Sequence, residues 1–452
     1  MPRATPPKPP SRPARAGIRT RLALFRRDIF RSQPERLYRA KMATLRTPLR
    51  SSFFLNTPAL IAPVLDHRPE DFPKAALVGR TLRALLGRSV FVTNGPEWQA
   101  QRRIIDPAFA SGRLRQSFPA MRDAGQAAVD RLRAGPVEME FETAHLAADV
   151  IFRTLFSIPI SHESAAAVFA GFRDYQRTQP ILSLADIIGL PGWFPRRRNR
   201  VADRAAAKIR GVLTELIDAR ARDIAAGTAP DDLASKIMTT ADPETGHRFS
   251  RAEMLDQVAI FFLAGHETSA SALSWALVCL AADPEAQNAV VDEIASVLGD
   301  RAPEFSDIPR LRFTRDVFRE VLRLYPPVPM MLRENRCPEV LRERRARAGS
   351  LMILSPWHLH RHETLWPRPD VFDPWRWQDQ DQHSCPRDAF IPFSRGARVC
   401  TGAGFAMVEG VLLLAMLIRA FHFAPTDEDP VPVAHLTLRA ENGIHLSLSP
   451  RG

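Results

Sequence analysis

The spacing of hydrophobic and polar residues along the chain is mainly that of the α-helix. From residue 96 onward, apolar positions recur every three or four residues over long stretches, which predicts amphipathic helices on a common core. These stretches cover residues 119–132, 137–156, 202–226, 251–282, 284–298 and 314–324, with a last apolar helix over about 402–420. The pattern predicts a mainly α protein with small β-sheets, an α+β fold.

Short strands are predicted near both ends of the chain. The segment SSFFLNTPALIAPVL (residues 51–65) has β-prone runs broken by turn residues, and residues 435–448 are strand-like. No internal repeat or linker divides the sequence, so residues 18–452 are predicted to form a single domain. Residues 1–17 are rich in Pro and Arg and are predicted to be a disordered basic arm.

Two segments invite comparison with membrane-binding sequences. Residues 18–43 mix Leu, Ile and Phe with many Arg, which suits either a first helix packed on the body or a segment lying on an anionic membrane surface. Residues 258–282 are long and apolar enough to cross a bilayer, but they hold Glu267 near their centre. An ionised acid there costs roughly 2.5 to 3.5 kcal/mol in lipid, so a long buried helix is the preferred interpretation.

Positive charge is concentrated at the N-terminus. The net charge is +12, and residues 1–50 carry 14 Lys or Arg against two Asp or Glu, which accounts for the whole excess. The rest of the chain is neutral overall, so no nucleic-acid partner is expected. The four cysteines form no C-x-x-C pair, which argues against a disulfide scaffold or a structural zinc site. We expect a cytoplasmic protein, with peripheral contact at the inner face of a membrane through residues 18–43 as an option.

The strongest chemical signal is the segment PFSRGARVCTGAGFA, residues 392–406. Cys400 lies directly before an apolar helix, where unpaired backbone N–H groups and the helix dipole stabilise a thiolate. A lone cysteine would more often be a buried structural thiol. The whole segment, however, resembles the haem-binding loop of the cytochrome P450 family, F-x-x-G-x-R-x-C-x-G-x-x-F-A. The defined positions are occupied by Phe393, Gly396, Arg398, Cys400, Gly402, Phe405 and Ala406.

The resemblance implies a cytochrome P450 fold with haem b as cofactor, whose iron Cys400 would bind through its thiolate. The segment AGHETS, residues 264–269, resembles the family's oxygen-activation motif A-G-x-[DE]-T. Glu267 and Thr268 would then deliver protons for oxygen scission in an apolar pocket. The plain alternative for Thr268 is a hydrogen bond to the carbonyl oxygen of Ala264, four residues earlier.

A third motif, FREVLRLYPPVP, resembles the family's E-x-x-R helix. Glu320 and Arg323 are three residues apart and share one helix face. Any helix offers such pairs, and an exposed pair contributes at most about 1 kcal/mol. By resemblance, the segment FDPWRW supplies Arg376 as the third member of a buried triad that would hold the loop carrying Cys400.

The fourth motif, GPEWQAQRRIIDPAF (residues 95–109), resembles the family's W-x-x-x-R helix. Trp98 and Arg102 are four residues apart and face the same way. The resemblance places Arg102, Arg398 and, with weaker support, Arg333 against the two haem carboxylates, which arginine can bind in bidentate fashion. For any single arginine in this Arg-rich chain, a solvated surface role is the default.

Together the motifs imply a haem-thiolate monooxygenase that inserts one oxygen atom of O2 into a lipophilic organic substrate. Electrons would come from a separate ferredoxin or flavodoxin-type donor with its NAD(P)H reductase, and an acidic ferredoxin would dock near Arg395 and Arg398. The alternatives are a peroxide-driven peroxygenase and a non-catalytic haem-thiolate sensor. By resemblance, the substrate pocket draws on mostly apolar segments at residues 85–92, 169–193, 260–264, 329–332 and 441–444.

Overall fold

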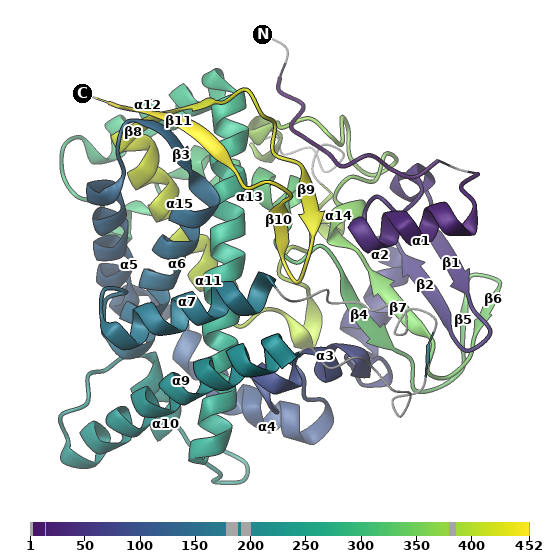
Figure 1. Ribbon diagram of the computed structural model, residues 1–452, viewed down its shortest axis with the longest axis horizontal. Helices are drawn as coiled ribbons and strands as arrows, with labels where there is room; N and C mark the ends of the chain where they lie inside the picture. Colours follow the sequence, from purple (N-terminus) through teal and green to yellow (C-terminus); the bar gives the residue numbers. More distant parts are fainter. Residues whose placement is uncertain (1–2, 14, 178–188, 191–199, 379–385, 452) are drawn as a thin grey trace.

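The structure is a computed structural model that describes residues 3–13, 15–177, 189–190, 200–378 and 386–451. Most of its helices gather on the left of Figure 1, and the four-stranded sheet lies on the right. The main helices are α3 (Ala76–Leu86), α4 (Gly95–Ile105), α5 (Ser111–Arg131), α6 (Met139–Phe156), α7 (Glu163–Arg177), α9 (Arg200–Ala226), α10 (Leu233–Thr239), α11 (Arg251–Ala282), α12 (Pro284–Leu298), α13 (Arg312–Leu324) and α15 (Ala403–Ala420). The predicted α+β fold is confirmed.

The long helix α11 runs through the middle of the helical side (Figure 1). Ser250 and Glu253 form a capping box that satisfies N–H groups left unpaired in the first turn. The helix packs against α6, α9, α13 and α15. Gly265 allows α6 to approach closely, because a Cβ at this position would clash with the side chain of Ile151. The predicted helix over residues 251–282 is confirmed as one largely buried element.

Residues 258–282, which we compared with a membrane span, lie within α11 and are mostly buried by its neighbours. Among the described residues, one helix has the length and hydropathy of a membrane span, and it is α15. Its most apolar window is 61% buried inside the protein, which is also the behaviour of a core helix.

Four strands form the largest sheet, in the order β1–β2–β7–β4, with one parallel pair between β2 and β7. A second sheet has the order β3–β11–β8, and the pairs β5–β6 and β9–β10 are separate hairpins. The strands are β1 (Met42–Arg46), β2 (Ser51–Leu55), β3 (Gly135–Glu138), β4 (Met331–Glu334), β5 (Glu339–Leu341), β6 (Arg344–Ala346), β7 (Leu351–Leu354), β8 (Phe421–Pro425), β9 (Pro432–Ala434), β10 (Leu438–Ala440) and β11 (His445–Pro450).

The predicted strand segments are shorter than expected. Residues 51–65 are extended only as far as Leu55, because Pro58 occupies the first turn of the short helix α2 (Pro58–Ala62). Residues 435–448 contain β10 and most of β11, separated by a turn in which Gly443 adopts a φ of +80°. In both segments the strand is shorter than expected because a turn-forming residue, Pro58 or Gly443, interrupts the hydrophobic run.

The N-terminal arm differs from our expectation of disorder, because residues 3–13 lie along the body (purple trace in Figure 1). The guanidinium carbon of Arg3 lies 3.5 Å from the ring centroid of Trp375. The ammonium group of Lys8 lies 2.7 Å from the carboxylate of Asp370. From composition alone, these cations would be expected to be solvated. In the structure they contact aromatic and acidic side chains of the folded domain.

The helix α1 (Ile18–Arg27) occupies the first part of residues 18–43. Leu22, Leu24 and Phe25 of this helix are partly buried. Arg27 and Arg31 pair with Glu441 near the C-terminus, at 3.0 and 2.7 Å. These contacts favour the packed helix over a segment lying on a membrane.

Candidate functional site

Cys400 lies in a tight hairpin immediately before α15. Gly396 adopts a φ of +69°, and a Cβ there would clash with the carbonyl oxygen of Leu65, so a side chain would strain this turn. The N–H of Cys400 donates a 2.9 Å hydrogen bond to the carbonyl oxygen of Phe393, which closes the hairpin. Gly402 is the N-cap residue of α15. The thiol of Cys400 therefore stands beside the N-terminal end of a helix.

The surroundings of Cys400 act on its thiol in two directions. The residue is exposed, but crowding by protein atoms withdraws the thiol from water and raises its pKa, while the N–H of Gly402 and the charge of Arg102 lower it. Burial raises the pKa of Cys279 far more, as expected of a structural thiol in the core. Cys337 is exposed and follows β4. Among the described cysteines, Cys400 is the one at a helix N-terminus.

One stripe of α11 is open, whereas most of the helix is buried. Ala264 is exposed, and Phe261, Gly265 and Thr268 are half-buried, with the three- and four-residue spacing of a single helix face. The hydroxyl of Thr268 donates a 2.5 Å hydrogen bond to the carbonyl oxygen of Ala264. The local bond that we named as the structural alternative is thus present, on a face that a ligand can reach.

Glu267 and Thr268 do not hydrogen-bond to each other in the described structure. The carboxylate of Glu267 is buried, accepts a 2.7 Å hydrogen bond from the hydroxyl of Thr437 and lies 3.1 Å from the guanidinium of Arg439. Its second oxygen, Oε2, is buried and has no hydrogen-bond partner in the part of the chain that the structure describes. Proton transfer from Glu267 to Thr268 therefore needs rotation of the acid or an intervening water.

Glu320, Arg323 and Arg376 are brought together in a buried network. Arg323 donates two hydrogen bonds, of 2.9 and 2.8 Å, to the two carboxylate oxygens of Glu320, and Arg376 donates a third of 2.9 Å. The N–H of Asp373 and the indole of Trp377 complete the shell at 3.0 Å each. Burial alone would raise the pKa of Glu320, but the attraction of Arg323 and Arg376 holds it below its ordinary value.

His360, which sequence reasoning missed, connects this network to the Cys400 loop. Its Nδ1 lies 3.2 Å from the carbonyl oxygen of Arg323, and its Nε2 accepts a 2.9 Å hydrogen bond from the N–H of Ile391. Burial lowers the pKa of His360 to about 3, so the ring is neutral and can donate on one side while it accepts on the other. Ile391 precedes Phe393, the residue that closes the Cys400 hairpin.

Three cations gather near the indole of Trp98, and a fourth cation acts on one of them. The side chains of Arg398, Lys74 and Arg102 lie 5.1, 5.5 and 5.8 Å from its ring centroid. Arg102 also donates a 2.8 Å hydrogen bond to the carbonyl oxygen of Val399, next to Cys400, and pairs with Asp106. A fourth cation, Arg333, follows in β4 and acts electrostatically on Lys74. Lys74 belongs to no motif in the sequence and was missed.

These cations have too few acidic partners. Burial and then Arg333, Arg398 and Arg102 lower the pKa of Lys74 well below its ordinary value. Burial and Arg398 lower the pKa of Arg333 to about 10, and no described carboxylate pairs with Arg333. Arg398 has one distant acidic partner, because its Nη2 lies 3.9 Å from the carboxylate of Glu70. Among the described residues, no hydrogen-bond partner reaches three buried guanidinium atoms, Nε of Arg333 and Nε and Nη2 of Arg398. A buried cluster of this kind calls for an anionic ligand.

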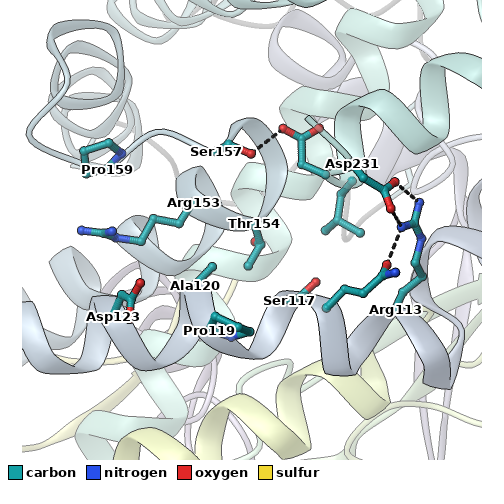
Figure 2. Close-up of a pocket in the computed structure, with 13 residues that line it drawn as sticks. Arg113, Ser117, Pro119, Ala120, Asp123, Arg153, Thr154, Ser157, Pro159 and Asp231 are labelled. Atoms are coloured by element: carbon teal, nitrogen blue, oxygen red, sulfur yellow. Dashed lines mark hydrogen bonds and ion pairs between the residues drawn. The ribbon is translucent and has the colours of Figure 1, made fainter. Parts of the chain in front are cut away.

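A surface cleft of about 320 Å³ lies elsewhere, between α5, the end of α6 and the start of α10 (Figure 2). Arg113 pairs with Asp231 across it at 2.6 Å, and Ser157 donates a 2.9 Å hydrogen bond to Asp232. None of the site residues predicted from the sequence lines this cleft. Its charged residues all have ion-pair partners, either in the lining or next to it, so the cleft carries no functional assignment.

The residues predicted for substrate binding are only partly described. Phe261 and Ala264 lie on the open stripe of α11, whereas the turn at residues 441–444 borders a different cavity, described below. Most of the predicted segment 169–193 beyond Arg177 lies outside the described residues.

The fold and the site together define a haem-thiolate protein. The orphaned guanidinium atoms of Arg333 and Arg398 suit the two carboxylates of haem, and a cysteine at a helix N-terminus suits its iron. The sequence model described as Cytochrome P450 matches residues 23–447. The chain belongs to the cytochrome P450 family; it is a P450 monooxygenase that binds haem through a cysteine thiolate.

Similar proteins span most of the chain. The cyclooctat-9-en-7-ol 5-monooxygenase of Streptomyces melanosporofaciens is 34% identical over 374 residues, which cover 81% of this chain and 79% of that protein. Cytochrome P450 4B1 of Rattus norvegicus is 30% identical, over 84% of this chain and 78% of its own. The crystal structure of the cytochrome P450DA heme domain superimposes with a TM-score of 0.80 at 24% identity, covering 100% of this chain and 98% of that one. The last likeness concerns the fold alone.

Proposed function

We propose that this monooxygenase hydroxylates a lipophilic substrate, and that the thiolate of Cys400 would bind the haem iron. The observation that carries the proposal is the glycine-framed hairpin that places an exposed thiol at the N-terminus of α15. Haem, when bound, supplies the binding and activation of O2. The protein supplies the thiolate, the charges that hold the haem carboxylates and the groups that move protons.

Four cations would hold the haem carboxylates. Arg333 and Arg398 have buried guanidinium atoms without a hydrogen-bond partner among the described residues, and Arg102 and Lys74 lie beside the indole of Trp98. Burial lowers the pKa of Lys74 most, and repulsion from the neighbouring arginines lowers it further; carboxylates bound there would offset that repulsion. We expect haem binding to raise that pKa towards its ordinary value.

Thr268 and Glu267 would share proton delivery. Thr268 lies on the open stripe of α11, where its hydroxyl can turn from the carbonyl oxygen of Ala264 towards a ligand. Glu267 holds its carboxylate on another side of the helix, beside Arg439. The acid therefore acts as the proton source, and the hydroxyl acts as the donor next to the substrate.

The substrate is expected to be apolar with few polar groups. Phe261 and Ala264 present an apolar surface along the open stripe. Two relatives from Streptomyces melanosporofaciens are named cyclooctat-9-en-7-ol 5-monooxygenase and cyclooctatin synthase, and a relative from Sus scrofa is named taurochenodeoxycholic 6 alpha-hydroxylase. We propose the same broad class, polycyclic or long-chain lipids such as terpenoids, steroids or fatty acids.

The electron donor is proposed to be a separate protein, a ferredoxin or flavodoxin with its NAD(P)H reductase. We expected the donor to dock near both Arg395 and Arg398. Arg398 is now removed from this docking site, because its side chain is buried among the cations around Trp98 and cannot face a partner. Arg395 keeps 31% of its side chain exposed and pairs with Asp66 at 2.8 Å. We therefore keep Arg395 alone as the docking cation of this loop.

One experiment separates the proposal from its alternatives. The reduced protein should give the carbon-monoxide band typical of a haem thiolate, and product should form with O2, NAD(P)H and a ferredoxin–reductase pair. Product formed only with added peroxide would indicate a peroxygenase. Substrates are sought in a panel of terpenoids, steroids and fatty acids, each checked for a substrate-induced spin-state shift. A normal band with no product from this panel would indicate a sensor.

A further inference from the structure

A cavity of about 500 Å³ lies between α6, α7, α11 and the β9–β10 hairpin, beside the acid of the proposed acid–alcohol pair. Its lining runs from His435 and Glu441, which are exposed, to His266 and Glu267, which are buried. Each water in a liquid occupies about 30 Å³, so the cavity has room for several waters. It therefore connects the protein surface with Glu267.

The lining of this cavity is unusually rich in ionisable groups. Glu138 and Glu140 come from the junction of β3 and α6, Arg173 and Tyr175 from α7, His266 and Glu267 from α11, and His435, Arg439 and Glu441 from the C-terminal hairpin and the turn after it. Glu267 lines this cavity, and its buried Oε2 has no hydrogen-bond partner among the described residues. A buried acceptor of this kind calls for water or a proton.

Arg439 joins two of these acids. Its guanidinium lies 3.1 Å from Glu267, and its positive charge also stabilises the carboxylate of Glu140. The backbone N–H of Ala440, the next residue, points to the carboxylate of Glu140 as well. One short strand thus holds both acids at the same cavity, although Glu140 and Glu267 belong to different helices.

We propose that Glu140 is a relay residue that passes protons from solvent, through water in this cavity, to Glu267. The inference rests on the proposed function of Glu267. Each oxygen insertion consumes O2, two electrons and two protons, and it leaves one oxygen atom in the product and one in water. Glu140 gives its proton to the cavity water and regains one from solvent, so it is unchanged after each turnover.

The ionisation of Glu140 suits this role. Burial raises its pKa to about 7, with opposition from Arg439 and support from Glu138 and Glu267, so both protonation states are populated near neutral pH. The neighbouring groups are less suited. Burial lowers the pKa of His266 to about 3, which keeps it neutral, and Glu138 already accepts the N–H of Phe141 as the cap of α6.

The test compares three variants of the haem-loaded protein. Glu140→Gln removes the titrating group, and Glu267→Gln removes the acid at the end of the relay. Glu142→Gln is the control, because it makes the same change two residues along α6, where the side chain pairs with Arg131 outside the cavity. Oxygen consumption with saturating reductant and substrate is measured from pH 5.5 to 8.5 in H2O and D2O. The carbon-monoxide spectrum and melting temperature show whether each variant is intact.

We expect Glu140→Gln to slow oxygen consumption about tenfold, less than the ~10²-fold typical of losing a direct acid or base. The solvent isotope effect of Glu140→Gln should be larger than that of the wild type. The wild-type rate should fall above an inflection near pH 7, and this inflection should be absent from the variant. Glu140→Asp should restore part of the rate. An infrared carboxyl band that titrates near pH 7 in the wild type should be missing from Glu140→Gln.

Two results would overturn the relay. If Glu140→Gln matches Glu142→Gln in rate, isotope effect and pH profile while Glu267→Gln is slow, protons reach Glu267 by another route and the proposed function stands. If Glu267→Gln is also unaffected, the proposed role of Glu267 fails together with the relay. If Glu140→Gln does not load haem, the relay is tested instead with Glu140→Asp and with the infrared titration of the wild type. The lack of a titrating carboxyl band in the wild type would then contradict the proposal.

Discussion

The hydroxyl of Ser269 donates a 2.5 Å hydrogen bond to Oε2 of Glu409, and this bond joins α11 to α15 inside the core. Ser269 directly follows Thr268, and Glu409 lies in the helix that begins after Cys400. The second oxygen of Glu409, Oε1, is buried, and none of the described residues forms a hydrogen bond with it. Burial raises the pKa of Glu409 to about 8, so the two helices of the site meet through a carboxyl group that is neutral at pH 7.

Replacing Glu409 should remove a pH dependence of stability. The folded pKa of about 8 exceeds the ordinary 4.5, so the folded state holds the extra proton and wild-type stability falls as the pH rises from 4.5 to 8. Glu409→Gln keeps the shape and the neutral form, so its stability relative to the wild type should grow by up to about 1.4 kcal/mol per pH unit in this window. Melting temperatures at pH 5 and pH 8, with the exposed Glu343→Gln as control, check this. A constant difference between wild type and Glu409→Gln contradicts it.

Cys400→Ser should abolish the haem-thiolate spectrum. A hydroxyl is a far weaker donor to iron than a thiolate, so the reduced carbon-monoxide band should disappear or move to the position of other haem proteins. Cys337→Ser changes the other exposed cysteine among the described residues and should leave the band unchanged. An unchanged band in Cys400→Ser, or a lost band in Cys337→Ser, would assign the ligand to another cysteine.

Glu320→Ala should prevent stable haem loading. Both Glu320 and Arg323 are fully buried, and removal of the acid leaves two arginines without their counter-charge, which costs on the order of 3 to 5 kcal/mol. The purified variant should contain little haem and melt at lower temperature than the exposed control Glu343→Ala. Normal haem content and melting in Glu320→Ala would show that the network is dispensable.

Local patterns in the sequence predicted the parts of the fold that are governed by local rules. The apolar period over residues 251–282 and the three-residue spacing of Glu320 and Arg323 both correspond to single helices. The helix α7 was not predicted, and it contains Gly171, which weakens the helical pattern. The structure gives this glycine a packing role, because a Cβ there would press on Ile209 of α9.

Contacts between distant residues could not be predicted in this way. Arg439 meets Glu267 across 172 positions in the chain, and His360 meets the carbonyl of Arg323 across 37. No spacing rule relates such residues, because tertiary packing alone brings them together. Lys74 escaped notice for the same reason, since it reaches Trp98 from a loop before α3. Adjacency can mislead as well, because neighbours in a helix point in directions about 100° apart, as Glu267 and Thr268 show.

Reduction by the electron donor should depend on salt. If an acidic ferredoxin docks through Arg395, the rate of haem reduction should fall as ionic strength rises, because charges separated by more than about 10 Å are screened at 0.1 M. Arg395→Gln should slow reduction at low salt and flatten the salt dependence. Reduction by dithionite provides the control and should be equal in both proteins. A rate that is independent of salt in the wild type would exclude electrostatic docking at this loop.

Thr268→Ala separates a catalytic hydroxyl from a structural one. The structural role is a single hydrogen bond to the carbonyl of Ala264, so its loss alone should lower stability by about 0.5 to 1.5 kcal/mol and leave the chemistry unchanged. If Thr268 also delivers protons next to the substrate, the variant should load haem and consume O2 and NAD(P)H, yet release more of the reduced oxygen as peroxide. Glu267→Gln should instead slow oxygen consumption itself, because it interrupts the supply before Thr268. The catalytic and structural roles are distinguished by measuring peroxide and product together for each NAD(P)H consumed. An unchanged product yield in Thr268→Ala would show that the helical hydrogen bond is the role of this residue.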